Sequence, residues 1–251
     1  MNRKQRTILG WLASLMIALL IWEITVLALK VRPIMLPAPH AIFLELGSEW
    51  VWYLSHCWYT LLTTLAGFSL AVVVGILVAI MLVGSPLFEN TIYPLIVAFN
   101  SVPKVAIAPL FVIWMGTGAE PKISIAFLIA VFAVIVDAAH GLRSVSNDVM
   151  DLGKVLKGSA WDFFFKVRLP GALPSILAGM KVAISLALVG TIVGEFVASQ
   201  RGLGYVILSA QGTFDTVRVF AAIGLLSIIG ILLYAAIAWL EWHVSKWRQS
   251  N

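Results

Sequence analysis

The sequence predicts an all-α integral membrane protein with about six transmembrane helices. Hydrophobic residue types make up 61% of its 251 residues, only 12% are charged, and the mean hydropathy is +1.00. Soluble domains carry about 25% charged residues, so an ordinary soluble enzyme is excluded. A helix that crosses a bilayer core of about 30 Å needs roughly 20 apolar residues. The chain therefore has room for about six spans with short connections, and we expect residues 1–251 to form a single transmembrane domain.

Nearly charge-free stretches define the expected spans in chain order. They are residues 8–29, 60–83, 91–115, 123–140, 176–195 and 219–240. The first follows the basic segment Arg3-Lys4-Gln5-Arg6 and continues without the small-residue cleavage site of a signal peptide, so we expect it to be a retained span. The second is the clearest, because residues 50–88 contain no Asp, Glu, Lys or Arg.

The distribution of lysine and arginine predicts how the spans are oriented. With the N-terminus in the cytoplasm, ten of the 17 lie in cytoplasmic segments and five, Lys122 among them, in outer segments. Lys104 and Lys181 lie in or at the edge of spans. Because positive residues favour the cytoplasmic side, we expect both termini there. This orientation accounts for the net charge of +5 without a nucleic-acid partner, and the lipid bilayer is the expected surrounding.

The third span is unusual because it contains Pro94, Pro103 and Pro109 together with Lys104. Each proline removes a backbone donor and clashes with the carbonyl four residues earlier. Freed carbonyls at membrane depth are tolerated where protein or water surrounds them, so we expect this segment inside a bundle. Two interpretations remain open. The prolines kink a packed helix whose Lys104 extends to the interface, or the segment lines a pathway and Lys104 contacts an anion.

The long connection between the fourth and fifth spans is expected to form two short amphipathic helices at about residues 147–168. Apolar residues recur there at helical spacing, namely Val149, Leu152, Val155 and Leu156. Gly158 suits a helix end, and Ser159 suits the N-terminal cap of the next helix. Pro170 and Pro174 are expected to end that second helix and to precede the fifth span.

The apolar side of this helix pair, which includes Trp161, needs a partner. Lipid headgroups accommodate amphipathic helices with aromatic and basic residues. A groove on a cytosolic protein accepts the apolar anchors of such a helix equally well. The residues alone leave both partners open.

The remaining candidates carry less chemistry. Cys57 is the only cysteine and the four histidines have no metal-ligand spacing, so we expect no catalytic residue and no metal. Glu195, at the outer end of the fifth span, is expected to be a structural hydrogen-bonding group or part of an outer gate. Gly190 and Gly194 have the spacing that lets helices approach closely, within the chain or between two copies. An outer surface helix is expected at about residues 41–54.

Several short motifs follow one another along nearly the whole chain. They are Leu36-Pro37-Ala38-Pro39, Gly67-Phe68, Val102-Pro103-Lys104-Val105-Ala106, Pro109-Leu110, Trp114-Met115-Gly116-Thr117-Gly118, Leu169-Pro170, Ala172-Leu173-Pro174, Gly194-Glu195 and Gly202-Leu203-Gly204-Tyr205. In this order and spacing the chain resembles the permease subunits of bacterial ABC importers, in the branch that handles nitrate, taurine and alkanesulfonates. The cytoplasmic signature of that family is E-A-A, three residues, G, nine residues and I-x-L-P.

This signature is matched in part. Val167-Arg168-Leu169-Pro170 aligns with its end, and Asp151-Leu152-Gly153 stands in place of the triplet. Gly158 lies one place after the expected glycine position, which is occupied by Lys157. The departure concerns the turn between the two helices.

The resemblance implies a type I ABC importer permease fold in the bacterial inner membrane, with a coupling-helix pair between the fourth and fifth spans. It implies that two permease copies form the pathway and that two cytosolic ATPase subunits, which bind ATP and Mg, hold the coupling helices. An external solute-binding protein would deliver the solute. This chain would bind no cofactor itself, and no G-x-x-x-x-G-K-[ST] loop occurs in its sequence.

The resemblance also implies coupling residues and a substrate class, whereas the solute-pathway residues are expected from the cost of polar and charged groups at membrane depth. The expected ATPase-coupling residues are Asp151, Leu152, Gly153, Leu156, Lys157, Gly158, Ser159 and Trp161. The expected solute-pathway residues are Asn100, Pro103, Lys104 and Glu195. We expect a transporter rather than an enzyme, which imports a small anion such as a sulfonate, taurine or nitrate by alternating access. A pyrimidine-type vitamin precursor is the alternative within the family, and a membrane-embedded enzyme, a channel or a secondary carrier are alternatives of other classes.

Overall fold

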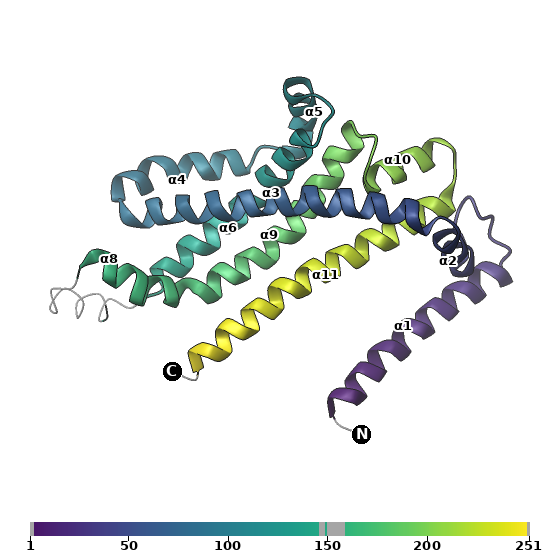
Figure 1. The fold of residues 1–251 in the computed structure, drawn as a ribbon, viewed down its shortest axis with the longest axis horizontal. Coiled ribbons are helices and arrows are strands. Elements are labelled where there is room, and N and C mark those ends of the chain that lie inside the picture. The colour runs from purple at the N-terminus through teal and green to yellow at the C-terminus, as the bar shows by residue number, and fades with distance from the viewer. Residues whose placement is uncertain (1–2, 146–148, 150–158, 250–251) are drawn as a thin grey trace.

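The computed structural model describes residues 3–145, 149 and 159–249, and in these residues the chain is helical with no strand. The helices are α1 (Arg3–Ala28), α2 (Pro39–Ser48), α3 (Trp50–Gly84), α4 (Pro86–Asn100), α5 (Lys104–Met115), α6 (Glu120–Arg143), α8 (Ala160–Phe163), the π-helical turn η1 (Phe164–Arg168), α9 (Leu169–Val197), α10 (Leu203–Gly212) and α11 (Thr216–Gln249). Figure 1 shows α2, α10 and the far end of α5 at one end of the bundle, and the two termini and α8 at the opposite end. The all-α fold class expected from the sequence is confirmed.

Four segments are long and apolar enough to cross a membrane. They are Trp50–Gly84, Glu120–Arg143, Trp161–Val197 and Thr216–Lys246. α4 and α5 meet the same criterion only as a bent pair, and α1 contains a shorter apolar stretch, Ala13–Ala28. In the described residues, the expected spans therefore correspond to four continuous helices, one broken pair and α1.

The centre of the bundle is α6, which packs against both α3 and α9. Small residues allow this close approach. A Cβ atom on Gly67 of α3 would lie 2.6 Å from Ala126 Cβ, and one on Gly190 of α9 would lie 2.6 Å from Ala126 Cα. A Cβ atom on Gly194 would lie 3.0 Å from Lys122 Cα. Of the two roles considered for the Gly190 and Gly194 pair, the structure therefore shows packing within the chain.

The third expected span is not one helix. α4 ends at Asn100, α5 begins at Lys104, and the chain bends by 93° between them. Pro103 precedes α5 in an extended conformation, with φ −65° and ψ 93°, and it has no N–H with which to continue the ladder of α4. The expectation of a single span over residues 91–115 is corrected to two helices that meet at a break, Ser101–Pro103.

The second cytoplasmic helix does not end where the sequence predicts. α8, η1 and α9 form one helical segment, Trp161–Val197, that passes through Pro170. In η1 the N–H of Leu169 donates to the carbonyl of Phe164, five residues earlier. This wider turn places Pro170 in the first turn of α9, where a residue without an N–H is tolerated. The expected stop after Arg168 is therefore wrong.

The expected surface helix at residues 41–54 is divided between α2 and α3. Glu49 separates the two helices with φ −121° and ψ 31°. α3 then begins at Trp50 rather than near residue 60, because the aromatic residues before Thr60 continue the helix without a break. The first turns of α3 thus carry the tryptophans that are typical of a membrane interface.

Candidate functional site

Lys104 lies at the break between α4 and α5, together with two other expected pathway residues. Its Nζ donates to the Asn100 carbonyl at 3.0 Å and to Asn100 Oδ1 at 2.6 Å. The same Nζ lies 4.5 Å from the ring centroid of Phe132 on α6, a distance that allows a cation–π contact. The structure therefore groups Asn100, Pro103 and Lys104 around one point of the chain.

The surface around the break is uncovered in the described part of the chain. α4, all of whose residues the structure describes, has no buried residue, and Ala108 is the one buried residue of α5. Phe99, beside the break, is 66% exposed, and Val102 and Val105 are also exposed. An apolar face of this extent requires lipid or another protein surface against it.

Glu195 lies elsewhere and holds the start of α10. Its side chain is 0% exposed. Oε1 accepts a hydrogen bond from the Thr60 hydroxyl at 2.8 Å, and Oε2 accepts one from the Gly204 N–H at 2.7 Å. Thr60 Oγ1 in turn accepts the N–H of Leu203 at 2.9 Å. Because the first N–H groups of a helix have no partner inside it, these bonds cap α10. Glu195 thus has the structural role that was one of its two expected roles, and its contact with a solute stays a prediction.

The glycines that precede and begin α10 are required by this carboxylate. Gly202 has φ +100°, a value that favours glycine, and a side chain there would overlap the carboxylate of Glu195. A Cβ atom on Gly204 would lie 2.8 Å from Glu195 Cβ. The N–H of Gly202 donates to Nδ1 of His56 at 3.0 Å. The motifs Gly194-Glu195 and Gly202-Leu203-Gly204 therefore contact each other, and together they form the N-terminal cap of α10.

Lys122 is the residue that sequence analysis missed, since it was counted only as an outer charge. Its side chain is 0% exposed, and its Nζ donates to three backbone carbonyls, those of Thr117 at 2.6 Å, Gly118 at 2.6 Å and Ala198 at 2.5 Å. A lysine ammonium has three donors, so all of them are used. A lysine that is the only charged residue in residues 121–136 was the available signal. We call Lys122, Glu195, Thr60 and His56 the α10 clamp.

The break and the α10 clamp lie at different levels of the bundle. Lys104 contacts Phe132 on α6, whereas Lys122, on the same helix, packs against Gly194 beside Glu195. Lys122 and Phe132 are separated by ten positions along α6, which corresponds to about 15 Å at 1.5 Å per residue. The structure therefore does not bring Glu195 to the other three expected pathway residues.

The expected ATPase-coupling residues fall mostly outside the described residues. This applies to Asp151, Leu152, Gly153, Leu156, Lys157 and Gly158. Ser159 Oγ accepts the N–H of Trp161 at 3.3 Å, as a helix cap does. The Trp161 side chain is 72% exposed and stacks on Phe165 with ring centroids 5.9 Å apart. An exposed aromatic pair at the start of a long helix is suited to a protein contact.

An ion cluster joins three segments at the end of the molecule that holds α10. Arg218 lies at the start of α11, and its Nε is 2.9 Å from Glu45 Oε1 of α2 and 3.3 Å from Asp215 Oδ2. Its Nη2 is 3.1 Å from Glu49 Oε1. Its guanidinium also lies 5.6 Å from the ring of Trp52. The cluster fixes α2 and the start of α3 to α11. The α2–α3 and α10–α11 connections therefore lie side by side at this end of the molecule.

The polar groups at the break suit binding rather than bond-making chemistry. They are an ammonium and an amide NH2, which can donate to an anion or a polar solute, and backbone carbonyls, which can accept from a polar solute. Within the part of the chain that the structure describes, no group of three or more His, Cys, Asp or Glu side chains could hold a metal ion. The break is therefore the strongest candidate for a solute contact.

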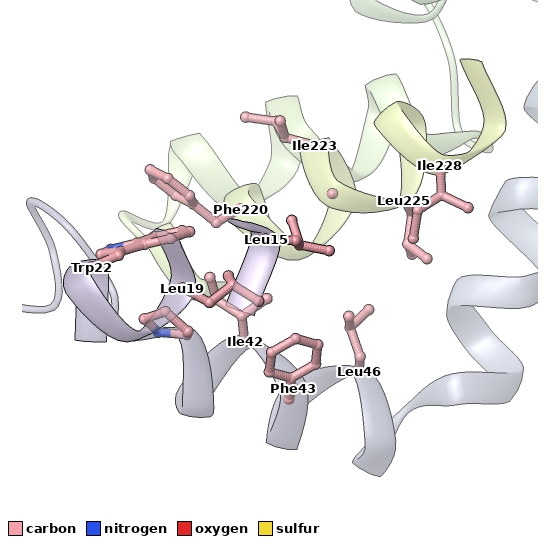
Figure 2. A pocket seen from close by; sticks show the side chains of 12 residues that line it. Leu15, Leu19, Trp22, Ile42, Phe43, Leu46, Phe220, Ile223, Leu225 and Ile228 are labelled. Atoms are coloured by element: carbon pink, nitrogen blue, oxygen red, sulfur yellow. The ribbon is translucent and has the colours of Figure 1, made fainter. Parts of the chain in front are cut away.

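A cavity of about 480 Å³ lies away from these residues, between α1, α2 and α11 (Figure 2). Its lining consists of Leu15, Leu19, Trp22, Pro39, Ile42, Phe43, Leu46, Phe220, Ile223, Gly224, Leu225 and Ile228. This lining is apolar apart from one indole nitrogen, so the cavity is unsuited to a small polar solute.

Comparison with known proteins agrees with these features. Residues 71–246 match the family described as binding-protein-dependent transport system inner membrane component. The formylaminopyrimidine transport permease protein of Halalkalibacterium halodurans is 32% identical over 234 residues, which cover 93% of this chain and 93% of that protein. The taurine transport system permease protein of Escherichia coli is 30% identical over 244 residues, which cover 94% and 88%. A chain of the MetNI methionine ABC transporter in an inward-facing conformation has a similar fold, with a TM-score of 0.69 and 18% identity over 78% of this chain and 98% of that chain.

Proposed function

The chain belongs to the family of binding-protein-dependent transport system inner membrane components and is a permease subunit of an ABC importer, and we propose that two copies of it form the passage for a small solute. Membership of this inner membrane family implies ATPase subunits and a solute-binding protein as partners. ATP and Mg would bind to the ATPase subunits, and this chain would contribute no ATPase site.

The observation that carries the two-copy proposal is the uncovered break between α4 and α5. Its bend of 93° and its proline leave backbone groups without helical partners, and such backbone is tolerated at membrane depth where protein or a water-filled cavity surrounds it. α4 has no buried residue. A second copy against this face would cover the exposed side chains and enclose a polar passage between the two breaks.

The proposed solute is a small anion such as a sulfonate, taurine or nitrate, which Lys104 would contact. Lys104 has no acidic partner in the described residues, and two of its three donors are taken by Asn100. An anion would accept from the third donor. The relative from Halalkalibacterium halodurans, named for formylaminopyrimidine transport, supports a pyrimidine-type precursor as the second candidate.

The proposed coupling contact is the exposed end of the segment Trp161–Val197, with residues 151–159 preceding it. ATP-driven closure of the ATPase subunits would displace this end and rock the two permease copies between inward- and outward-facing states. We place both termini in the cytoplasm, because lysine and arginine are more numerous on that side and because α8 lies at the same end of the molecule as the termini (Figure 1).

The function is tested by uptake into proteoliposomes that contain the permease, its cognate ATPase subunits and the external solute-binding protein. We expect uptake that requires all three proteins and ATP. Calorimetry of the solute-binding protein with taurine, a sulfonate, nitrate and formylaminopyrimidine identifies the solute class. Uptake by the permease alone would contradict the proposed mechanism.

The coupling contact is tested by Trp161→Ala. Because the side chain is 72% exposed, we expect a change in unfolding free energy within about 0.5 kcal/mol. Loss of a tryptophan anchor from an interface should lower ATP-driven uptake by about tenfold or more. Trp239→Ala, which removes a tryptophan with 59% exposure on α11, is the matched control and should leave uptake unchanged. Equal losses in both variants would remove Trp161 from the contact.

A further inference from the structure

Two neighbouring cavities follow one face of α1. The apolar cavity in Figure 2 includes Leu15, Leu19 and Trp22 of α1. A second cavity of about 460 Å³ begins at Val26 and Leu27. Counted from Leu15, the residues Leu19, Trp22 and Val26 follow at four, seven and eleven positions, a spacing that places all four on one side of a helix. The second cavity thus continues the line of the first toward the end of α1.

The apolar cavity contains one polar group without a partner. Nε1 of Trp22 is buried and has no hydrogen-bond partner. Its ring lies 5.8 Å from the ring of Phe220 on α11, and Figure 2 shows it at one end of the cavity, with Leu46 and Ile228 toward the other. A buried donor costs free energy until it finds an acceptor, so an occupant with a carbonyl near Trp22 would be stabilised there.

Two basic side chains line the second cavity, and hydrogen bonds hold the segment that bears them. Its lining includes Lys30 and Arg32, which are exposed and have no acidic partner in the described residues. The Met35 N–H donates to the Arg32 carbonyl at 2.8 Å, and the Thr216 hydroxyl donates to the Ile34 carbonyl at 2.7 Å. The connection that presents the two cations is therefore tied to the start of α11.

The nearby acid does not oppose an anion in this cavity. Glu23 is paired with His40, with 2.6 Å between Oε1 and Nδ1, and it also accepts the N–H of His40 at 3.2 Å. The unpaired charges that face the second cavity are therefore the positive ones of Lys30 and Arg32.

We propose that the two cavities together bind one phospholipid of the membrane leaflet at this end of the protein. The phosphate lies between Lys30 and Arg32, an ester carbonyl accepts from Trp22 Nε1, and one acyl chain fills the apolar cavity. The lengths agree, because at 1.5 Å per residue Trp22 lies about 9 Å along α1 from its end at Ala28, two positions before Lys30, and Leu15 lies about 10 Å from Trp22 in the opposite direction. Lipid is also the medium around α1 and α11, and an empty apolar cavity would forgo its dispersion contacts.

The acyl-chain arm of the test uses Gly224, which lines the apolar cavity and has no atom within 4 Å of a Cβ placed on it. Gly224→Leu should fill the cavity without a clash, and it replaces a poor helix former with a good one. Native mass spectrometry of the purified full-length chain should show one retained phospholipid fewer per chain. Gly10→Leu on α1, which also meets nothing within 4 Å, is the matched control and should retain the lipid.

The headgroup arm uses Lys30→Gln with Arg32→Gln. In nanodiscs titrated with phosphatidylglycerol, this double variant should raise the half-saturating lipid concentration by about tenfold, since charge-assisted bonds to the phosphate are lost. Arg201→Gln with Lys246→Gln, an equal change of charge elsewhere, should not. Phosphatidylglycerol with brominated chains should quench Trp22 fluorescence, measured as the difference from Trp22→Phe, and Gly224→Leu should abolish that quenching. Inorganic phosphate alone should leave lipid binding unchanged.

Three results would overturn the proposal. They are equal lipid retention in Gly224→Leu and the unaltered protein, displacement of the lipid by millimolar inorganic phosphate, and disulfide cross-linking of two chains that carry Phe43→Cys in a Cys57→Ser background. The last result would mean that a second copy covers the cavity. None of the measurements uses transport, so failure here is distinguishable from failure of the proposed function.

Discussion

Two lysines of the membrane-spanning segments, Lys122 and Lys104, have their charge and donors satisfied in different ways. Lys122 of the α10 clamp is fully buried, and its three donors meet three backbone carbonyls. Lys104 at the break uses Asn100 as its acceptor in both of its hydrogen bonds. A cation at membrane depth is costly and needs compensation. Complete compensation at Lys122 fits a structural residue, whereas Lys104, with two hydrogen bonds and the Phe132 ring beside it, keeps one donor for the solute contact that we propose.

The surroundings of Lys122 are also more closely packed than those of Lys104. The α10 clamp lies among α3, α6 and α9, where glycines bring the helices into close contact. The break lies between α4 and α5, in which Ala108 is the one buried residue. We therefore expect changes in the clamp to affect folding and changes at the break to affect transport.

Lys122→Met should have the largest effect. It leaves the carbonyls of Thr117, Gly118 and Ala198 without their donor and removes the positive charge near Glu195. We expect a loss of about 3 to 5 kcal/mol of stability, as when one partner of a buried charge is removed, and little monodisperse protein. Thermal unfolding in detergent measures this change. A variant with unaltered stability would contradict the structural role of Lys122.

Thr60→Val should have the next largest effect. The substitution keeps the shape of the side chain but removes the donor to Glu195 and the acceptor for the Leu203 N–H. We expect a loss of about 1 to 3 kcal/mol in unfolding free energy, because buried polar groups lose their partners. Thr60→Ser retains the hydroxyl and should recover most of that loss in the same melts. Equal destabilisation by Val and Ser would mean that packing rather than the hydroxyl matters.

Lys104→Met is the same substitution as Lys122→Met, made at the break instead of in the α10 clamp. With its surroundings exposed, we expect unfolding free energy within about 0.5 kcal/mol of the unaltered protein. Uptake should fall by about tenfold, the size expected when a charge-assisted bond to an anionic solute is lost. ATP-driven uptake measured beside thermal unfolding separates the two effects. Unchanged uptake kinetics would remove Lys104 from the pathway.

Arg218→Gln should have the smallest effect. The side chains of Arg218 and Glu49 are 36% and 42% exposed, so solvent screens the charges of the cluster. We expect a loss of about 0.5 to 1 kcal/mol, which 0.5 M salt should largely mask. Unfolding measured at low and high salt tests this. A loss as large as that of Lys122→Met would mean that the surface cluster, rather than the clamp, secures this end of the protein.

The sequence was sufficient for the fold class and for the location of the unusual segment. Long charge-free stretches such as residues 50–88 follow directly from the requirements of a bilayer, and three prolines indicated that residues 91–115 could not form a straight helix. The angle of the break was not predictable, because it depends on how α4 and α5 pack on the rest of the bundle. The wrong stop at Pro170 has a local cause, since a single π-helical turn accommodates the proline.

The candidate site was predictable only where its residues are close in sequence. Asn100 ends α4 and Lys104 begins α5 only four positions later, so their contact across the break is local in sequence. The contacts of Glu195 with Thr60, and of Lys122 with Ala198, join residues 135 and 76 positions apart. One sequence gives no measure of such pairing, so Lys122 looked like an ordinary boundary charge, and Glu195 could be expected to have a structural role or a gate role without its partners being named.

The wide turn at Phe164–Arg168 has a mechanical consequence. Because it lets the chain pass through Pro170 without a joint, Trp161 and Glu195 belong to a single rod of 37 residues, about 55 Å long at 1.5 Å per residue. In the proposed coupling, a displacement of Trp161 by the ATPase subunits would be carried along this segment toward Glu195, whose carboxylate caps α10. One polypeptide segment would then hold both the proposed coupling contact and the anchor of the neighbouring helix.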